Sequence, residues 1–197
     1  MSAAADFDRL NQQLHAANLV LFFSIAASTC IINTNMSFTE IPLRLPGVVL
    51  ASAMPFSGYD PDGELLELFC DLHISAVVVL CTLEEILSVS GRDLPALYAS
   101  AGMQVISLPI ADLGTPDLPA LESAVRVALE HVSAGGNLAV HCHAGVGRTG
   151  LFTACLASRV QGIAGEQALQ WIRQFIPHAI ETEKQRQLLV EFGRAAC

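Results

Sequence analysis

Positively charged residues are scarce in this chain. Its 197 residues include 10 Lys and Arg against 19 Asp and Glu, which gives a net charge of −9 and a pI near 5.0. Proteins that bind nucleic acid or dock on anionic membranes carry a basic patch or stripe, and the sequence contains none. We therefore expect neither nucleic acid nor a membrane among its partners.

The cysteines lack the spacings of a disulfide framework or a zinc site. There are 6 of them, scattered along the chain without any Cys-x-x-Cys pair. Disulfide frameworks are typical of secreted proteins, whereas free thiols persist in reducing compartments. We expect a cytoplasmic, monomeric protein with reduced thiols, and we expect neither a metal nor another cofactor.

The sequence also lacks an apolar run long enough to cross a bilayer comfortably. The run at residues 19–32 is short and interrupted by Ser and Thr, and residues 1–18 lack the positive charge of a signal peptide. We expect residues 1–35 to form an N-terminal extension, either helical or disordered. Three alternatives stay open: no packed role with translation starting at Met36, a helix docked on the domain, or a targeting segment.

The remaining sequence alternates between apolar strand patterns and helical patterns, with no repeat and no internal linker. This alternation predicts one α/β domain with a mostly parallel central sheet and helices on both faces. Strands are expected at residues 48–52, 76–81, 104–108 and 137–140. Helices are expected at 60–72, 94–101, 119–133, from about 150 onward, at 165–175 and at 182–195.

Residues 141–150 read HCHAGVGRTG and carry most of the functional information. They follow a buried strand and precede a helix, which is where parallel sheets bind ligands and where helix N-termini bind anions. Cys142 would be the nucleophile, favoured as thiolate by the loop N–H groups and by Arg148. Gly145 and Gly147 let the backbone form an anion nest. Arg148 would grip two phosphate oxygens, and Thr149 could donate to the cysteine sulfur.

Two other interpretations of this loop exist. Cys142 could be a core residue before an ordinary Gly-rich turn, or His141 and His143 could bind a metal. Consecutive strand residues point to opposite faces, and no Cys-x-x-Cys pair is present to complete a zinc site, so we expect no metal here. We expect His141 instead to anchor the loop by hydrogen bonds. We expect His143, Ala144 and Val146 to contribute N–H groups to the phosphate site.

The loop resembles the signature loop of the cysteine-dependent protein tyrosine phosphatase superfamily. The dual-specificity branch fits better, because the Asn-x-x-Tyr-Arg segment of the tyrosine-specific branch is missing. Within this branch the chain is similar to the cyclin-dependent-kinase-associated phosphatase family. The likeness extends from about residue 45 to 192, and implies a phosphatase domain at 36–197. It is carried by segments 80–82 with 94–98, 109–117 and 179–185.

The resemblance also implies further site residues. Asp112, on a loop flanked by Gly114 and Pro116, is the expected general acid, because a poor leaving group needs a proton. Asp117 is the alternative acid, although it also fits a helix N-cap. Gln185 could place the attacking water or be an exposed, solvated side chain. Independently of the resemblance, Cys81 ends the strand at 76–81, and neighbouring parallel strands should bring it near the signature loop. It could therefore be a resolving thiol for oxidised Cys142 or a small core residue.

The loop departs from the family pattern at Ala144 and Thr149, and the late segment departs at Glu181. None of these changes removes a catalytic group. The predicted function is hydrolysis of phosphothreonine, phosphoserine or phosphotyrosine in a phosphorylated protein, with a kinase as one candidate substrate, through a phosphocysteine intermediate. The alternatives are a phosphatase for a phosphoinositide or small molecule, and an inactive module that only reads phosphate.

Overall fold

The computed structural model describes residues 38–194. The predicted N-terminal extension, with its apolar run at 19–32, lies outside these residues. None of the helices within 38–194 is long and apolar enough to cross a membrane.

The core of the domain is a five-stranded sheet in the order β1-β2-β5-β3-β4. β2 (Val49–Ser52), β5 (Asn137–His141), β3 (Ile74–Val79) and β4 (Gln104–Ser107) are parallel, and β1 (Phe38–Glu40) pairs with β2 in the antiparallel sense. The predicted mostly parallel sheet is therefore confirmed. β1 was not predicted, because a strand of only 3 residues shows no periodic pattern.

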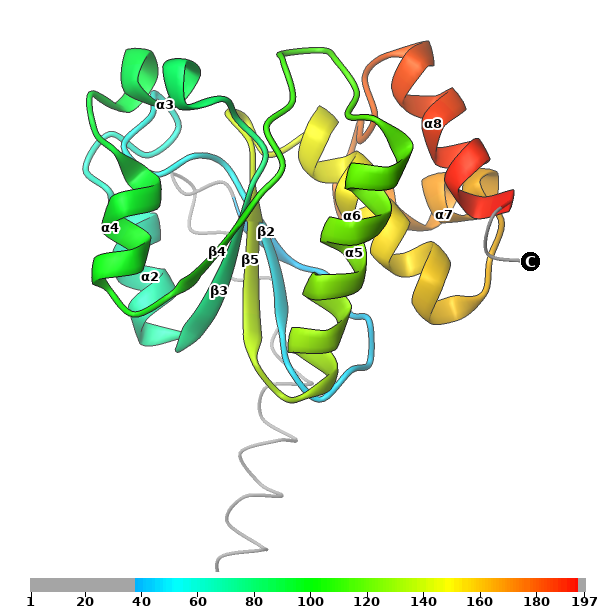
Figure 1. Ribbon diagram of the computed structural model, residues 1–197, viewed down its shortest axis with the longest axis horizontal. Coiled ribbons are helices and arrows are strands. Elements are labelled where there is room, and N and C mark those ends of the chain that lie inside the picture. The colour runs from blue at the N-terminus through cyan, green and yellow to red at the C-terminus, as the bar shows by residue number, and fades with distance from the viewer. Residues whose placement is uncertain (1–37, 195–197) are drawn as a thin grey trace, which may run out of the picture. The chain divides into compact units, whose positions relative to one another are not determined.

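Helices cover both faces of this sheet, as predicted (Figure 1). One face carries the three helices α2 (Glu64–Asp71), α3 (Leu83–Ser90) and α4 (Leu94–Ser100). The other face carries α5 (Leu118–Ser133), α6 (Gly147–Gln161), α7 (Gly165–Ile172) and α8 (Glu183–Arg194).

Helix α6 is buried along most of its length. Every residue from 147 to 158 is buried, because α6 packs against the sheet and against α5, α7 and α8. Its large apolar side chains, Leu151 and Phe152, are 0% exposed, and full burial of such a side chain stabilises a fold by about 2–3 kcal/mol. The N-terminus of α6 is thus held in place by the packing of the whole helix.

The strand register brings the carboxyl ends of the parallel strands together. His141 at the end of β5 pairs with Ser52 at the end of β2 and with Val79 at the end of β3. Val79 in turn pairs with Ser107 at the end of β4. The loops that follow these strands share one edge of the sheet, and ligands bind at this edge in open parallel sheets.

Two helices differ from the sequence expectations. α3 was not predicted because it has only 8 residues, although Leu83, Ile86 and Leu87 have the spacing of one helix face. α6 begins at Gly147 and not near Gly150. Glycine disfavours helix, but packing of this turn against the rest of the domain overrides that propensity.

Candidate active site

The loop between β5 and α6 wraps around the N-terminus of α6. Gly145 has φ 77°, and a Cβ there would lie 2.7 Å from the Ser52 carbonyl group, so only glycine fits this close approach. The Met54 N–H donates to the His143 carbonyl at 2.9 Å and ties the loop to the segment after β2. No side chain caps α6 at Val146, so its first N–H groups are available to an anion.

Cys142 and Arg148 lie at the two ends of this loop. Cys142 is buried, with 3% of its surface exposed, and it follows directly on the last residue of β5. Arg148 is the second residue of α6, and its side chain is also 3% exposed. The predicted nucleophile and the predicted phosphate-binding arginine are therefore in one small loop, as their spacing in the sequence requires.

Glu85 is a site residue that the sequence analysis missed. Its two carboxylate oxygens each accept a hydrogen bond of 2.7 Å from Arg148, one from Nη1 and one from Nη2. Burial raises the pKa of Glu85, but the hydrogen bonds and charge of Arg148 outweigh burial and the net shift is downward. Glu85 lies in the first turn of α3, capped by Thr82. The sequence signals were the Thr82-x-x-Glu85 pattern of a helix N-terminus and the position of Glu85 just after a strand that neighbours β5.

The Arg148 guanidinium also binds the loop between β4 and α5. Its Nη1 donates to the Ile110 carbonyl at 2.9 Å, and its Nη2 donates to Asp112 Oδ1 at 3.1 Å. Burial lowers the pKa of Arg148, yet the hydrogen bonds to Glu85 and the surrounding negative charges produce a net increase. Arg148 therefore stays a cation and joins the signature loop, α3 and this third loop.

The two candidate acids are placed differently. Asp112 is at the site, on Arg148, with 72% of its side chain exposed and thus accessible to a substrate. Asp117 is the N-cap residue of α5 and makes no side-chain capping bond. Within the described residues, it forms no ion pair with Arg148. The geometry therefore favours Asp112 as the candidate acid, and its role stays a prediction.

His141 holds the start of the loop through a buried hydrogen-bond chain. Its Nδ1 lies 3.2 Å from the Cys142 carbonyl and its Nε2 lies 3.0 Å from the Tyr98 hydroxyl. Burial lowers the pKa of His141 to about 4, so the ring is neutral near pH 7. A carbonyl can only accept, so Nδ1 donates, and Nε2 accepts from Tyr98. The predicted anchoring role fits these contacts, and Tyr98 on α4 is a partner that the sequence did not reveal.

The remaining loop side chains make few polar contacts. His143 packs edge-on against Tyr59, with ring centroids 5.6 Å apart. Within residues 38–194, no group of three or more potential ligands could hold a metal ion. The Thr149 hydroxyl is buried and has no hydrogen-bond partner within the same range. The predicted bond from Thr149 to the Cys142 sulfur is thus not made in this structure.

Cys81 lies just past the end of β3, next to the strand that leads into Cys142. Burial raises the pKa of the Cys81 thiol, the charge of Arg148 opposes this in part, and the net shift is strongly upward. A protonated thiol is a poor nucleophile. The position suits a resolving thiol, but the protonation state disfavours it, and this role stays a prediction.

Gln185 is completely buried, so the alternative of an exposed, solvated side chain is wrong. Its amide bonds to two backbone groups, the Glu181 N–H and the Gly114 carbonyl. Glu181 lies beside the signature loop: its Oε2 fills the space that a Cβ on Gly147 would need. The late segment therefore packs on both the signature loop and the Asp112 loop.

Comparisons with known proteins agree with this arrangement. A family model described as a polymorphic toxin system DSP-PTPase phosphatase matches residues 62–161, half of the chain and all of the signature loop. The chain belongs to the DSP-PTPase phosphatase family. The predicted family is thus confirmed.

Relatives and solved structures point to the same family. Cyclin-dependent kinase inhibitor 3 from Homo sapiens is 32% identical over 121 residues, which are 60% of this chain and 57% of that protein. Protein tyrosine phosphatase domain-containing protein 1 from Danio rerio is 32% identical over 100 residues, 51% of this chain and 14% of that protein. The chain thus spans less than two thirds of either relative.

The fold agrees with a solved structure of kinase associated phosphatase in which the catalytic site cysteine is substituted by a serine. The TM-score is 0.73 at 25% sequence identity, over 83% of this chain and 97% of that chain. The predicted protein-tyrosine-phosphatase-like fold is therefore confirmed.

Proposed function

We propose that this protein hydrolyses phosphoserine, phosphothreonine or phosphotyrosine in protein substrates through a phosphocysteine on Cys142. One observation carries the proposal: the buried Arg148 guanidinium, next to the cysteine loop, binds the carboxylate of Asp112 at 3.1 Å. A nucleophile, a phosphate-binding cation and an acid thus converge at the N-terminus of α6. Together they supply what phosphate monoester hydrolysis needs.

In the first step, Cys142 Sγ attacks phosphorus and the bond from phosphorus to the ester oxygen breaks. Asp112 donates a proton to that oxygen, which leaves as the hydroxyl of the substrate residue. Arg148 and the N–H groups at the start of α6 hold the phosphoryl oxygens, where negative charge must be stabilised. Glu85 fixes the guanidinium in place through its two hydrogen bonds.

In the second step, water attacks phosphorus and the bond between phosphorus and sulfur breaks. The Asp112 carboxylate accepts the proton from that water, because the acid of the first step is the base of the second. Inorganic phosphate leaves and the Cys142 thiolate is restored. The Thr149 hydroxyl, buried and without a partner within residues 38–194, is free to donate to the departing sulfur.

A protein substrate is favoured over a polyphosphorylated headgroup. The half-buried loop residues His143, Ala144 and Val146 include no Lys or Arg, and a headgroup with several phosphates needs such cations. The similarity to cyclin-dependent kinase inhibitor 3 supports a phosphorylated protein, and a phosphorylated kinase is one candidate. Phosphoinositide or small-molecule hydrolysis and phosphate binding without turnover are the competing outcomes.

The test measures phosphate release from phosphopeptides, a phosphorylated kinase and soluble phosphoinositides. We expect release from the phosphopeptides, and Cys142→Ser should abolish it while tungstate, a phosphate mimic, still binds in calorimetry, because serine is a far weaker nucleophile here. Faster release from phosphoinositides would favour the lipid alternative. If the native protein binds tungstate but hydrolyses none of the substrates, it is a module that binds phosphate without catalysis.

The acid is tested with Asp112→Asn and with Asp117→Asn as the matched control. General acid catalysis is typically worth about 10²–10⁴ in rate. Asp112→Asn should therefore lose about a hundredfold or more on a phosphothreonine peptide and little on an activated aryl phosphate, and Asp117→Asn should keep both rates. Exchanged phenotypes would assign the acid to Asp117.

A further inference from the structure

The loop that carries Asp112 is joined to α8 by the amide of Gln185. Gln185 Oε1 accepts a 2.9 Å hydrogen bond from the Glu181 N–H, and its Nε2 donates a 3.1 Å hydrogen bond to the Gly114 carbonyl. The side chain is 0% exposed. One end must accept and the other must donate, so a carboxylate or an apolar side chain cannot make both bonds.

Other contacts hold the same loop on both sides of Asp112. Before it, the Ile110 carbonyl accepts from Arg148 at 2.9 Å. After it, the Leu113 carbonyl accepts from the Thr182 hydroxyl at 3.4 Å, and the Gln185 bond follows at Gly114. Leu113 has φ 57°, a left-handed conformation that surrounding contacts must maintain in a non-glycine residue. The turn that directs Asp112 to the site therefore depends on these bonds.

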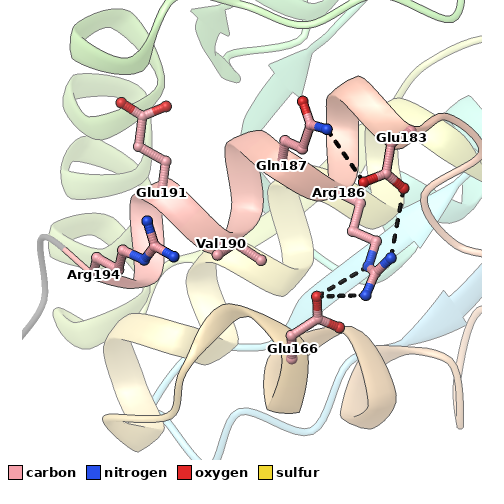
Figure 2. Close-up of a pocket in the computed structure, with 7 residues that line it drawn as sticks. All are labelled: Glu166, Glu183, Arg186, Gln187, Val190, Glu191 and Arg194. Atoms are coloured by element: carbon pink, nitrogen blue, oxygen red, sulfur yellow. Dashed lines mark hydrogen bonds and ion pairs between the residues drawn. The ribbon is translucent and has the colours of Figure 1, made fainter.

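Helix α8 is itself anchored to α7, so it offers a firm support. Figure 2 shows Arg186 reaching from α8 to Glu166 on α7, with N–O distances of 2.9 Å. Arg186 also lies 3.5 Å from Glu183 in the first turn of α8. Gln185 and Arg186 are adjacent, but the first side chain is buried and the second is half exposed.

We propose that Gln185 is a positioning residue: it holds the Asp112 loop so that the carboxyl group meets the leaving oxygen. This inference rests on the proposed phosphatase function and replaces the water-placing role suggested by the sequence. A fully buried amide that already bonds two backbone groups is not open to the attacking water. The effect of Gln185 on the reaction therefore passes through Asp112.

The two roles predict different kinetics. Loss of a clamp on the general acid slows substrates with poor leaving groups and spares those with good ones. Loss of a water-placing group slows hydrolysis of the phosphocysteine, which is the same intermediate for every substrate. It would slow turnover of all substrates alike and produce a burst of the leaving group in rapid-mixing experiments.

The test compares Gln185→Met with wild type on a phosphothreonine peptide and on an activated aryl phosphate. Methionine has a similar length and suits a buried site. We expect kcat/KM for the peptide to fall by about tenfold or more, within the range of lost acid catalysis, and kcat for the aryl phosphate to change by less than about twofold. Gln187→Met makes the same change two residues along, on the exposed face of α8. It is the matched control and should leave both rates unchanged.

The double variant Asp112→Asn with Gln185→Met gives the decisive measurement. Because one residue acts through the other, the double variant should be no slower on the peptide than Asp112→Asn alone. Additive losses, equal losses on both substrates, or a burst would each overturn the clamp. Gln185→Glu keeps the side-chain volume and the acceptor but loses the donor to Gly114. If the methionine variant does not fold, this variant replaces it in the same two assays, with the same expected rates.

This result is separable from the proposed function. Wild-type rates in Gln185→Met, together with an inactive Cys142→Ser, would refute the clamp and leave the phosphatase mechanism standing. Activity in Cys142→Ser would refute the mechanism itself.

Discussion

The neutral, buried His141 should make folding stability depend on pH. Burial lowers its pKa from an ordinary 6.5 to about 4 in the folded protein. In the unfolded chain the ring takes up a proton as the pH falls through 6.5, but in the folded protein it stays neutral. The stabilisation is therefore complete above about pH 6.5 and decreases as the pH falls toward 4.

The size of the effect follows from these two pKa values. One pKa unit corresponds to about 1.4 kcal/mol. At pH 5 the pH lies about one and a half units below the pKa of the unfolded histidine but still above the pKa of the folded one, so only the unfolded chain has taken up the proton. The free energy of unfolding should thus decrease by about 2 kcal/mol between pH 7.5 and 5.0 through His141 alone. Other groups titrate in the same range, so the contribution must be isolated by difference.

Urea unfolding of wild type and His141→Asn at both pH values provides that difference. The asparagine amide can still donate to the Cys142 carbonyl but does not titrate, so the variant should lack the extra loss of about 2 kcal/mol at pH 5.0. His73→Asn is the control: it removes an exposed histidine from a left-handed position that Asn tolerates. Equal pH dependence in wild type and His141→Asn would show that the buried ring does not stay neutral.

Three further predictions concern the signature loop at residues 141–150. Arg148→Lys keeps the charge but loses the fork that pairs with Glu85, so kcat/KM for an aryl phosphate should fall by about a hundredfold or more. Gly145→Ala should inactivate the protein because its Cβ meets the Ser52 backbone, whereas Gly162→Ala, also left-handed but with open space around it, should cost only about 1 kcal/mol in thermal unfolding. EDTA should leave activity intact, and restoration of lost activity by zinc would point to a metal role for His143.

The parts of the site that are contiguous in sequence were predictable. Residues 141–150 are contiguous, so their spacing alone places Cys142 and Arg148 together. Apolar runs between the helical segments locate four of the strands. Glu85 was not predictable, because it is 63 positions from Arg148 and meets it only since β3 and β5 are neighbours in the sheet. A glutamate in the first turn of a short helix carries no local sign that it pairs with a distant arginine.

The burial of Gln185 was not predictable from the local sequence either. It lies in a run of polar residues, Glu183 to Gln187, which reads as a solvated first turn of a helix. Its burial results from a contact with Gly114, 71 positions away, and with the loop that carries Asp112. The family resemblance singled out Gln185 as a site residue. Only the tertiary contacts indicate what its amide does.

The double pairing of Arg148 bears on how substrates reach the site. Two carboxylates, those of Glu85 and Asp112, more than offset the single charge of this arginine, and the whole chain carries a net charge of −9. Such a site repels anions at long range, so capture of a phosphate should be slow and should become faster as the ionic strength rises. In the proposed reaction, a phosphoryl group that binds Arg148 takes the place of the Asp112 carboxylate there. Recognition of the phosphate and release of the acid toward the leaving group are then a single exchange of partners.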